Sequence, residues 1–544
     1  MIIRINAPKG TSPRTNPRNL ANDQAQTATN VDLRSGKIVP FGIDSSVNHV
    51  NTVAGAINSI YHFATNTAAP KFIEWLASNV SVVRGATAQN TNERTYYTGD
   101  GTPKKLDDTR VDVAGNITPL EMGIPQPSAP SAGATPNADA GLNETTSYVV
   151  TYYTSWGEEG EPSLPSANVT FDSTAVSIAV SGLPTAPPAG AYSISGIRIY
   201  RAATGFAGTQ YQFVAQTAFT GTYTDTTDTS SLAEVLSTTG FTAPPATMQG
   251  LVSMPNGIMA AYNGSDLLFS EPYQPHAWPV SYMLSVNSPI VGLAAFGNSL
   301  LIATQDVPYI ATGVHPSAMT LQKLEVNQSC VSHRSVVDMG YYAAYASPDG
   351  MVTVGINGAQ VSTLPLFTRT EWQALNPSSI HGYFSDGRYI GFYDATATGG
   401  VRGGFILDPN NPDFGVTWLD NWYVAGYSDS IDDSLYLITE FVGTTQPDIV
   451  KFDSGASKTA TWKSKVFVLP YPVSFSCAQV RGVLPVTLNV YAEGAIKHSH
   501  TVSNDSPFHL PSGFRATEWE VEVSGTGTVY SIALAGSFRE LGRV

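Results

Sequence analysis

Histidines and paired acidic residues are the side chains in this sequence with the clearest potential for chemistry. The nine histidines are not clustered at the spacing of metal ligands. His498 and His500 would share one face of a strand, because successive side chains of a strand alternate, but no third ligand lies near them in the sequence. We therefore expect solvent-exposed histidines and no metal site.

Three acidic pairs could each supply half of the two-carboxylate machinery of a glycosidase: Asp107-Asp108, Glu158-Glu159 and Asp432-Asp433. All three lie in turn-like contexts, which favours solvated loops. The sequence contains no GxxxxGK[ST] phosphate loop, no HExxH pair and no GxSxG elbow. We expect no catalytic residue, no cofactor and no enzymatic activity.

Cys330 and Cys477 are the only cysteines. Two cysteines cannot form a disulfide framework, and no CxxC spacing indicates metal or redox chemistry. One bridge between them is an alternative, but the pattern favours two buried free thiols.

The composition of the chain excludes further classes of function. The chain has 544 residues, which predicts several domains, and a net charge of −15 with only 13% charged residues. An acidic chain lacks the basic footprint of a phosphate-binding protein, although DNA could pass along it without binding. Neither a signal peptide nor an apolar run of 18 residues is evident, so we expect a protein made in a cytoplasm and released inside a particle.

Residues 1–30 differ in charge from the rest of the chain. They contain four basic residues against the single acid Asp23, and three prolines interrupt any helix. One interpretation is a solvated, extended arm. The other is an arm that docks on an acidic neighbour through its basic residues, Arg4, Lys9, Arg14 and Arg18.

The rest of the sequence predicts short strands separated by tight turns, with almost no helix. Dipeptides such as Asn263-Gly264 and Asp386-Gly387 are typical of hairpin turns. We predict an all-β fold: an irregular β-propeller core, an inserted fibronectin-III- or immunoglobulin-like β-sandwich, and a C-terminal β domain. The expected segments are an arm at 1–30, propeller at 31–124, sandwich at 125–245, propeller at 246–461 and C-terminal domain at 462–544.

Several stretches resemble the tail nozzle proteins of short-tailed bacteriophages, the group also called tail tubular protein B. Residues 19–41 resemble the opening of such proteins, and 405–423 with 462–465 resemble the passage from propeller to C-terminal domain. Residues 152–163 and 196–201 are similar to fibronectin-III-like modules inserted in phage tail proteins.

The resemblance implies a structural virion protein, made in the bacterial cytoplasm and located in the tail. It implies a homohexameric ring that continues and closes the distal DNA-ejection channel. The partners implied are a tail tube or adaptor protein above the ring and tail fibres or spikes. Viral DNA would pass through without specific binding, and no catalytic residues are carried over.

Two alternatives remain open at this stage. One is a carbohydrate-binding or carbohydrate-active β-propeller protein, which a signal peptide and a convergent carboxylate pair would favour. The other is a host-recognition adhesin of the tail, which we would expect to form trimers rather than a six-fold ring.

Overall fold

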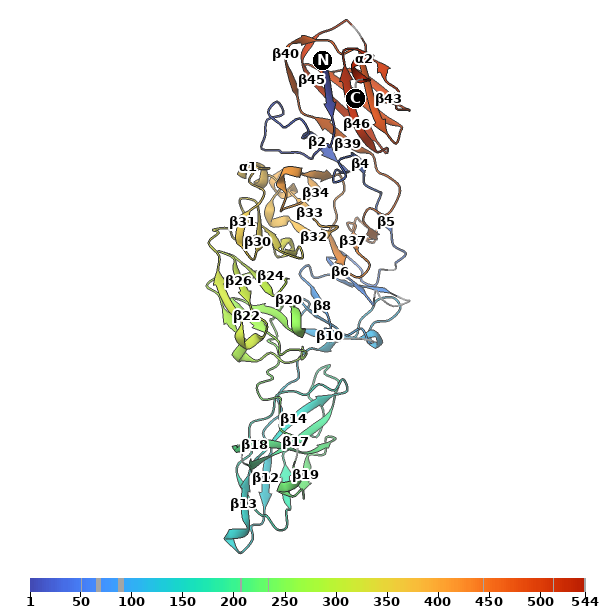
Figure 1. Cartoon of the computed structure of the whole chain (residues 1–544). Helices are drawn as coiled ribbons and strands as arrows, with labels where there is room; N and C mark the ends of the chain where they lie inside the picture. Colours follow the sequence, from blue (N-terminus) through green and yellow to red (C-terminus); the bar gives the residue numbers. More distant parts are fainter. Residues whose placement is uncertain are drawn as a thin grey trace. The chain divides into compact units, whose positions relative to one another are not determined.

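The computed structural model describes residues 1–49, 51–64, 70–86, 92–205, 208–232, 234–443, 445–511 and 513–542. The prediction of an all-β protein is confirmed (Figure 1). Among these residues only two short α-helices occur, α1 (Arg369–Gln373) and α2 (Phe538–Leu541). A capping box between Thr368 and Glu371 stabilises the start of the first helix.

The chain forms two compact units. One comprises residues 1–78, 301–310 and 322–544, and the other comprises residues 79–300 and 311–321. Each unit contains small antiparallel sheets whose strands follow one another in the sequence. Such sheets are the building blocks of a β-propeller, but the propeller arrangement itself stays a prediction.

Three four-stranded sheets have all or some of their strands in the second unit. The first contains β8 (Ser81–Arg84), β9 (Thr95–Thr98), β10 (Lys104–Leu106) and β11 (Leu120–Glu121). The second contains β20 (Gln249–Ser253), β21 (Met259–Asn263), β22 (Asp266–Phe269) and β23 (Leu284–Ser285). The third contains β24 (Ile290–Phe296), β25 (Ser299–Thr304), β26 (Tyr309–Thr312) and β27 (Thr320–Lys323).

Residues 125–245, hereafter the insert, have a core of their own. One three-stranded sheet contains β12 (Ser131–Ala134), β16 (Ile178–Ser181) and β19 (Thr222–Asp225). The other contains β14 (Tyr148–Thr154), β17 (Ile194–Gly205) and β18 (Gly208–Thr217), while β13 (Asn143–Thr146) pairs with β15 (Val169–Asp172). Val150, Val180 and Ile199 from both three-stranded sheets share one buried cluster, as in a β-sandwich.

The first unit holds three further small sheets. One contains β28 (Val337–Asp338), β29 (Ala343–Ala346), β30 (Met351–Gly355) and β31 (Gly358–Val361). Another contains β36 (Ala425–Asp429), β37 (Ser434–Ile438) and β38 (Ile449–Lys451), and is completed by β5 (Ser45–Ser46) from the beginning of the chain. The pair β6 (Ser59–Phe63) and β7 (Lys71–Trp75) forms a two-stranded sheet.

A ten-stranded sheet extends from residue 381 into the C-terminal region. Its strands are β32 (His381–Ser385), β33 (Arg388–Asp394), β34 (Arg402–Leu407), β35 (Thr417–Leu419), β2 (Ala25–Thr29), β39 (Ala460–Ser464), β45 (Ala516–Gly525), β42 (Val486–Ala492) and β43 (Ala495–Val502), with β40 (Phe467–Val473) on β45. Strand β2 therefore joins the earlier strands to those of the C-terminal region.

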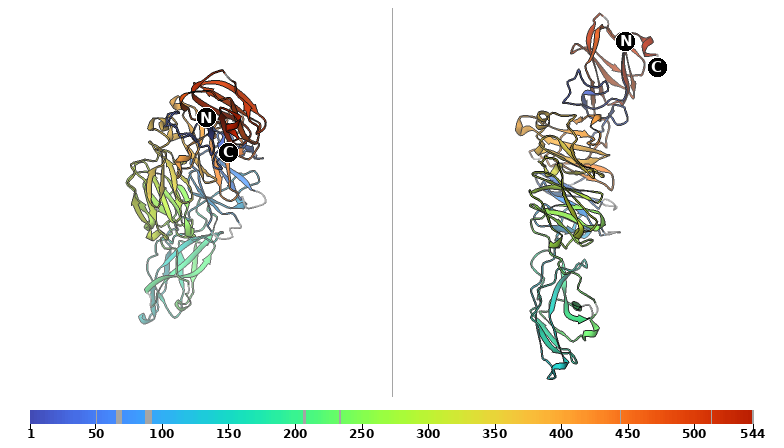
Figure 2. Two further views of the ribbon diagram at one scale, coloured as in Figure 1. Left: turned by 45° about the horizontal axis from the view of Figure 1, so that its top comes forward. Right: turned by 60° about the vertical axis from the view of Figure 1, so that its left-hand side comes forward.

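The N-terminal segment, residues 1–30, is not the extended arm that the sequence predicts. Strand β1 (Ile2–Ile5) pairs antiparallel with β46 (Val529–Ala535), which also pairs with β41 (Cys477–Gly482). The sheet is completed by β44 (Phe508–His509), and the short pair β3 (Val31–Asp32) and β4 (Val39–Pro40) follows β2. Ile3 and Ile5 are buried in the C-terminal core, and both views of Figure 2 place the two termini in the same group of strands. Burial of these apolar side chains stabilises the packing of the segment against the C-terminal core.

Candidate functional site

The four basic residues singled out by the sequence differ in their surroundings. Arg4 lies in β1 opposite Ala533. Lys9 Nζ is 3.0 Å from Asp23 Oδ2, and Arg18 pairs with Glu518 at 2.8 Å. The side chain of Arg14 donates to the carbonyl of Leu364 at 2.6 Å. Three of the four therefore have partners within the chain, which contradicts the picture of a free docking arm.

The acidic pairs only partly occupy the solvated loops that the sequence predicts: Asp108, Asp432 and Asp433 are exposed. Asp107 and Glu158 are buried, and Glu159 is half-buried against Arg198 at 2.7 Å. Asp433 is exposed at a hairpin corner, where its φ is +52°. The expectation fails at the buried residues because each has hydrogen-bond or ionic partners that the sequence does not reveal.

Glu158 is the centre of a buried charged cluster. Its Oε2 atom accepts from Lys105 Nζ at 2.5 Å, and the Lys105 side chain is fully buried. Burial lowers the pKa of Lys105 and is partly offset by the Glu158 charge. Burial acts most strongly on Glu158 and raises its pKa, but the charge and hydrogen bond of Lys105, together with smaller contributions from His276 and Thr154, hold that pKa below its usual value. The indole of Trp156 lies beside the cluster, with the Arg94 guanidinium 4.8 Å from its ring centre.

His276 faces this cluster in one defined tautomer. Its Nε2 atom lies 2.9 Å from the carbonyl oxygen of Glu159, which can only accept, so Nε2 carries the proton. Burial lowers the pKa of His276, so the ring is neutral and Nδ1 presents a lone pair. Nδ1 lies 4.0 Å from Glu158 Oε1, and neither atom has a hydrogen-bond partner among the described residues. Because Lys105 is inaccessible, we interpret the cluster as a clamp between the insert and β10.

His498 and His500 share one strand face, as the sequence predicts. Their rings stack with centroids 5.7 Å apart, and the His500 ring also packs on Phe508 at 4.3 Å. Both histidines are half-buried rather than fully exposed. Among the described residues they belong to no cluster of three potential metal ligands. Cys330 and Cys477 are both free and buried, which confirms the prediction for the cysteines.

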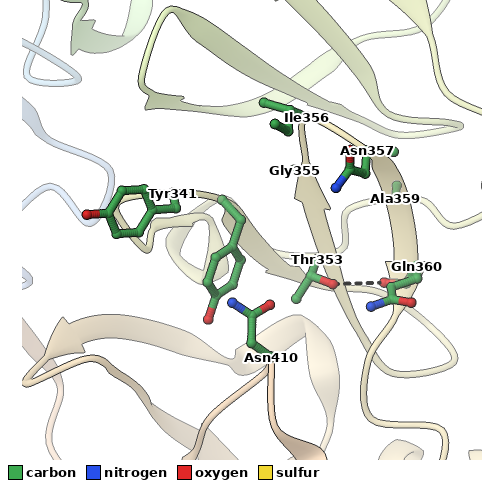
Figure 3. Close-up of a pocket in the computed structure, with 10 residues that line it drawn as sticks. Tyr341, Thr353, Gly355, Ile356, Asn357, Ala359, Gln360 and Asn410 are labelled. Carbon is green, nitrogen blue, oxygen red and sulfur yellow. Dashed lines mark hydrogen bonds between the residues drawn. The ribbon is translucent and has the colours of Figure 1, made fainter.

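An open cleft lies in the first unit. It has a volume of about 350 Å³ and lies between the β28–β31 sheet and the turn that follows β34. Figure 3 shows Tyr341, Ile356, Gln360 and Asn410 arranged around it. The ring of Tyr341 is 93% exposed and Ile356 is 81% exposed, which is unusual for large apolar side chains.

The lining of this cleft is uncharged and rich in hydrogen-bonding groups. The side-chain amides of Asn357, Gln360 and Asn410 have no hydrogen-bond partner within the described chain. Burial, together with the nearby charge of Asp408, raises the pKa of Tyr342, so its hydroxyl stays a neutral donor. The sequence analysis missed this cleft, because its residues come from separate hairpins and carry no motif.

Comparison with known proteins does not identify a family. No protein family and no curated protein sequence matches the chain. Among solved structures, BBS1N in complex with ARL6DN is 10% identical, with 73% of this chain and 96% of that chain covered and a TM-score of 0.26. The surface component PorZ of Porphyromonas gingivalis is 9% identical, with 83% and 63% covered and a TM-score of 0.26.

The tricorn protease is also matched, at 12% identity and a TM-score of 0.20, with 81% of this chain and 45% of that chain covered. Scores this low carry no argument about function. Within the described residues, no helix has the length and apolar character needed to cross a membrane.

Proposed function

We propose that this chain is a structural protein of a bacteriophage tail, a nozzle-like ring component through which DNA passes. The supporting observation concerns the segments whose sequence resembles the nozzle proteins. The ten-stranded sheet contains four consecutive neighbours, β34, β35, β2 and β39. These strands come from three segments that resemble nozzle proteins and are far apart in the chain. Thr29 is in register with Trp418, and Ala28 with Trp462.

Electrostatics supports the same proposal. A DNA conduit must let phosphates slide, so it should offer few unpaired basic groups. The chain has 28 lysines and arginines against 43 acids, and three of the four basic residues of the N-terminal segment have partners within the chain. A surface of this kind repels DNA weakly instead of holding it.

Mass measurement on the purified full-length chain tests the proposal. We expect particles of six copies of the 57.7 kDa chain, with six-fold rings in electron micrographs. We also expect no retention of double-stranded DNA at physiological salt. A protein that stays monomeric at all concentrations and is absent from purified virions would contradict the proposal, and a trimer would favour the adhesin.

The cleft of Figure 3 favours a second candidate function, binding of a neutral carbohydrate. An exposed tyrosine ring offers a face for a sugar ring, and free amides match sugar hydroxyls. Titration with neutral oligosaccharides tests this candidate. Tyr341→Ala should abolish binding, whereas Tyr471→Ala, at another exposed tyrosine, should not. We expect no release of reducing sugar in either case.

A further inference from the structure

Three potential metal ligands converge in the first unit from distant parts of the sequence. His62 lies on β6, Asp429 ends β36, and Asp432 lies in the hairpin that leads to β37. His62 Nδ1 is 2.8 Å from Asp429 Oδ2 and 4.0 Å from Asp432 Oδ2. All three ligand atoms lie within 4.8 Å of one another.

The surrounding groups hold these three atoms in place. The backbone N–H of Ile431 donates to Asp429 Oδ1 at 2.8 Å, which leaves Oδ2 toward His62. The hydroxyl of Tyr436 donates to Asp432 Oδ2 at 2.6 Å. The imidazole of His62 stacks on the ring of Phe72, with centroids 4.5 Å apart and planes 9° apart. Outer contacts of this kind orient metal ligands in proteins.

The charged surroundings of Asp432 differ from those of several other carboxylates in the chain. Asp225 is paired with Arg201, Glu158 with Lys105, and Asp44 with Lys458. Within the described part of the chain, no lysine or arginine forms an ion pair with Asp432, whose ionic partner is His62. Two neighbouring carboxylates and one imidazole nitrogen offer a cation three ligand atoms, and Asp429 and His62 are nearly inaccessible to water.

We infer that His62, Asp429 and Asp432 form a binding site for one divalent transition-metal ion, of the class of zinc or manganese. Imidazole nitrogen combined with carboxylate oxygen suits these ions better than calcium, which prefers oxygen alone. Metal–ligand bonds of about 2.0–2.2 Å place neighbouring ligand atoms roughly 3.0–3.5 Å apart. The observed separations of 2.8 and 4.0 Å bracket that range.

The site has a route of entry and a structural consequence. The Asp432 side chain is 27% exposed, so an ion can reach the two buried ligands from that side. The bound ion uses the lone pair of His62 Nδ1, so the imidazole proton lies on Nε2 in the metal-bound form. A metal there would connect β6 with the β36–β37 hairpin, although 367 residues separate His62 from Asp429.

Metal titration of the full-length chain, after treatment with EDTA, tests the inference. Calorimetry with Mn²⁺ and with Zn²⁺ should show a site that Asp432→Asn weakens by at least about tenfold. The matched control is Asp433→Asn, because this neighbour is exposed in the same hairpin and asparagine tolerates its positive φ. The control should bind like the parent chain, and metal should raise the melting temperature of both.

Two further measurements keep the test decisive. His62→Gln should also weaken the site, and circular dichroism should show that each variant is folded. Electron paramagnetic resonance of bound Mn²⁺ should show nitrogen coupling in the parent chain that His62→Gln removes. A double substitution of His498 and His500 with Ala should leave the site intact. Absence of metal binding, or equal losses in Asp432→Asn and Asp433→Asn, would overturn the inference.

Discussion

The N-terminal segment and the insert are built into the protein in opposite ways. Both have proline-rich stretches that suggest peripheral structure. The insert carries its own buried cluster, with Ile178 and Ile197 contributed by different sheets. The N-terminal segment has no separate core, and its Ile3 and Ile5 belong to the core of the C-terminal region.

The difference shows that a segment folds independently when it has a hydrophobic core of its own, whatever the composition of its flanks. A segment with few apolar residues cannot bury enough surface to fold by itself. It becomes ordered only where another part of the chain supplies the partner strands. The insert, with eight strands, satisfies this condition internally and needs only an anchor, which Glu158 and Lys105 provide.

Deletion of residues 1–30 should have the largest effect. It removes β1 and β2, exposing the edge of β46 and dividing the ten-stranded sheet between β35 and β39. We expect the C-terminal region to lose cooperative unfolding and to become sensitive to proteases. Limited proteolysis with mass spectrometry measures this. A truncated chain as protease-resistant as the parent would contradict our account of the segment.

Point substitutions in β1 provide a matched pair for the same comparison. Ile5→Ala removes a buried side chain and should cost about 2–5 kcal/mol of unfolding free energy. Ile2→Ala, at an exposed position of the same strand, should change it little.

Glu158→Gln should have the next largest effect, on the attachment of the insert. The substitution leaves the fully buried Lys105 without its counter-charge, which costs about 3–5 kcal/mol. Chemical denaturation measures the loss. The double variant Lys105→Met/Glu158→Gln should recover most of it, because no unpaired charge is then buried. Equal stability of Glu158→Gln and the parent would show that the cluster is not a clamp.

Acidification should destabilise the same anchor through His276. Its folded-state pKa lies below 6.5, so below pH 6.5 the unfolded chain binds a proton that the folded chain does not. Stability should therefore fall as pH decreases from 6.5, by up to about 1.4 kcal/mol per pH unit for this group. His276→Gln should show a shallower slope. Burial also lowers the pKa of His381. This residue is present in both the parent and the His276→Gln variant, so its contribution cancels when the two slopes are compared. Identical slopes would exclude this role for His276.

Deletion of the insert should have a small effect on the remainder. Its two flanks touch, since a side chain on Gly123 would meet the ring of Pro244 at 2.6 Å, so a short Gly-Ser linker can join them. The deletion removes Glu158 together with Trp156, whose ring centre lies 5.3 Å from Lys105 Nζ, so Lys105 loses its partner and part of its cover at once. We therefore expect a soluble remainder with a melting temperature close to that of the parent. Aggregation or rapid proteolysis of the remainder would show that the insert is part of the core.

Arg18→Ala should have the smallest effect. The side chain of Arg18 is 59% exposed, and an exposed ion pair with Glu518 contributes less than about 1 kcal/mol. Thermal unfolding measures it. A larger loss would mean that charge, and not the burial of β1, holds the N-terminal segment in place.

The sequence alone determined the fold class and several local features. Period-two alternation and scarce helix signals predict β-structure, which depends on local preferences that neighbouring residues already specify. The hairpin at Asp386-Gly387 is of this kind, since both residues have positive φ. The two buried free cysteines are likewise predicted from the sequence.

Only the tertiary structure decided where strand edges and charges meet. Residues 1–30 are predicted to be an arm, because nothing in the local sequence indicates that β1 pairs with β46, more than 500 residues away. The sequence predicts a loop position for Glu158, and only the structure shows Lys105 beside it. In the same way, His62 has no potential metal ligand near it in the sequence, and only the structure brings Asp429 next to it. The physical reason is that hydrogen-bonding edges and buried charges are satisfied by partners in space, and a local pattern does not specify those partners.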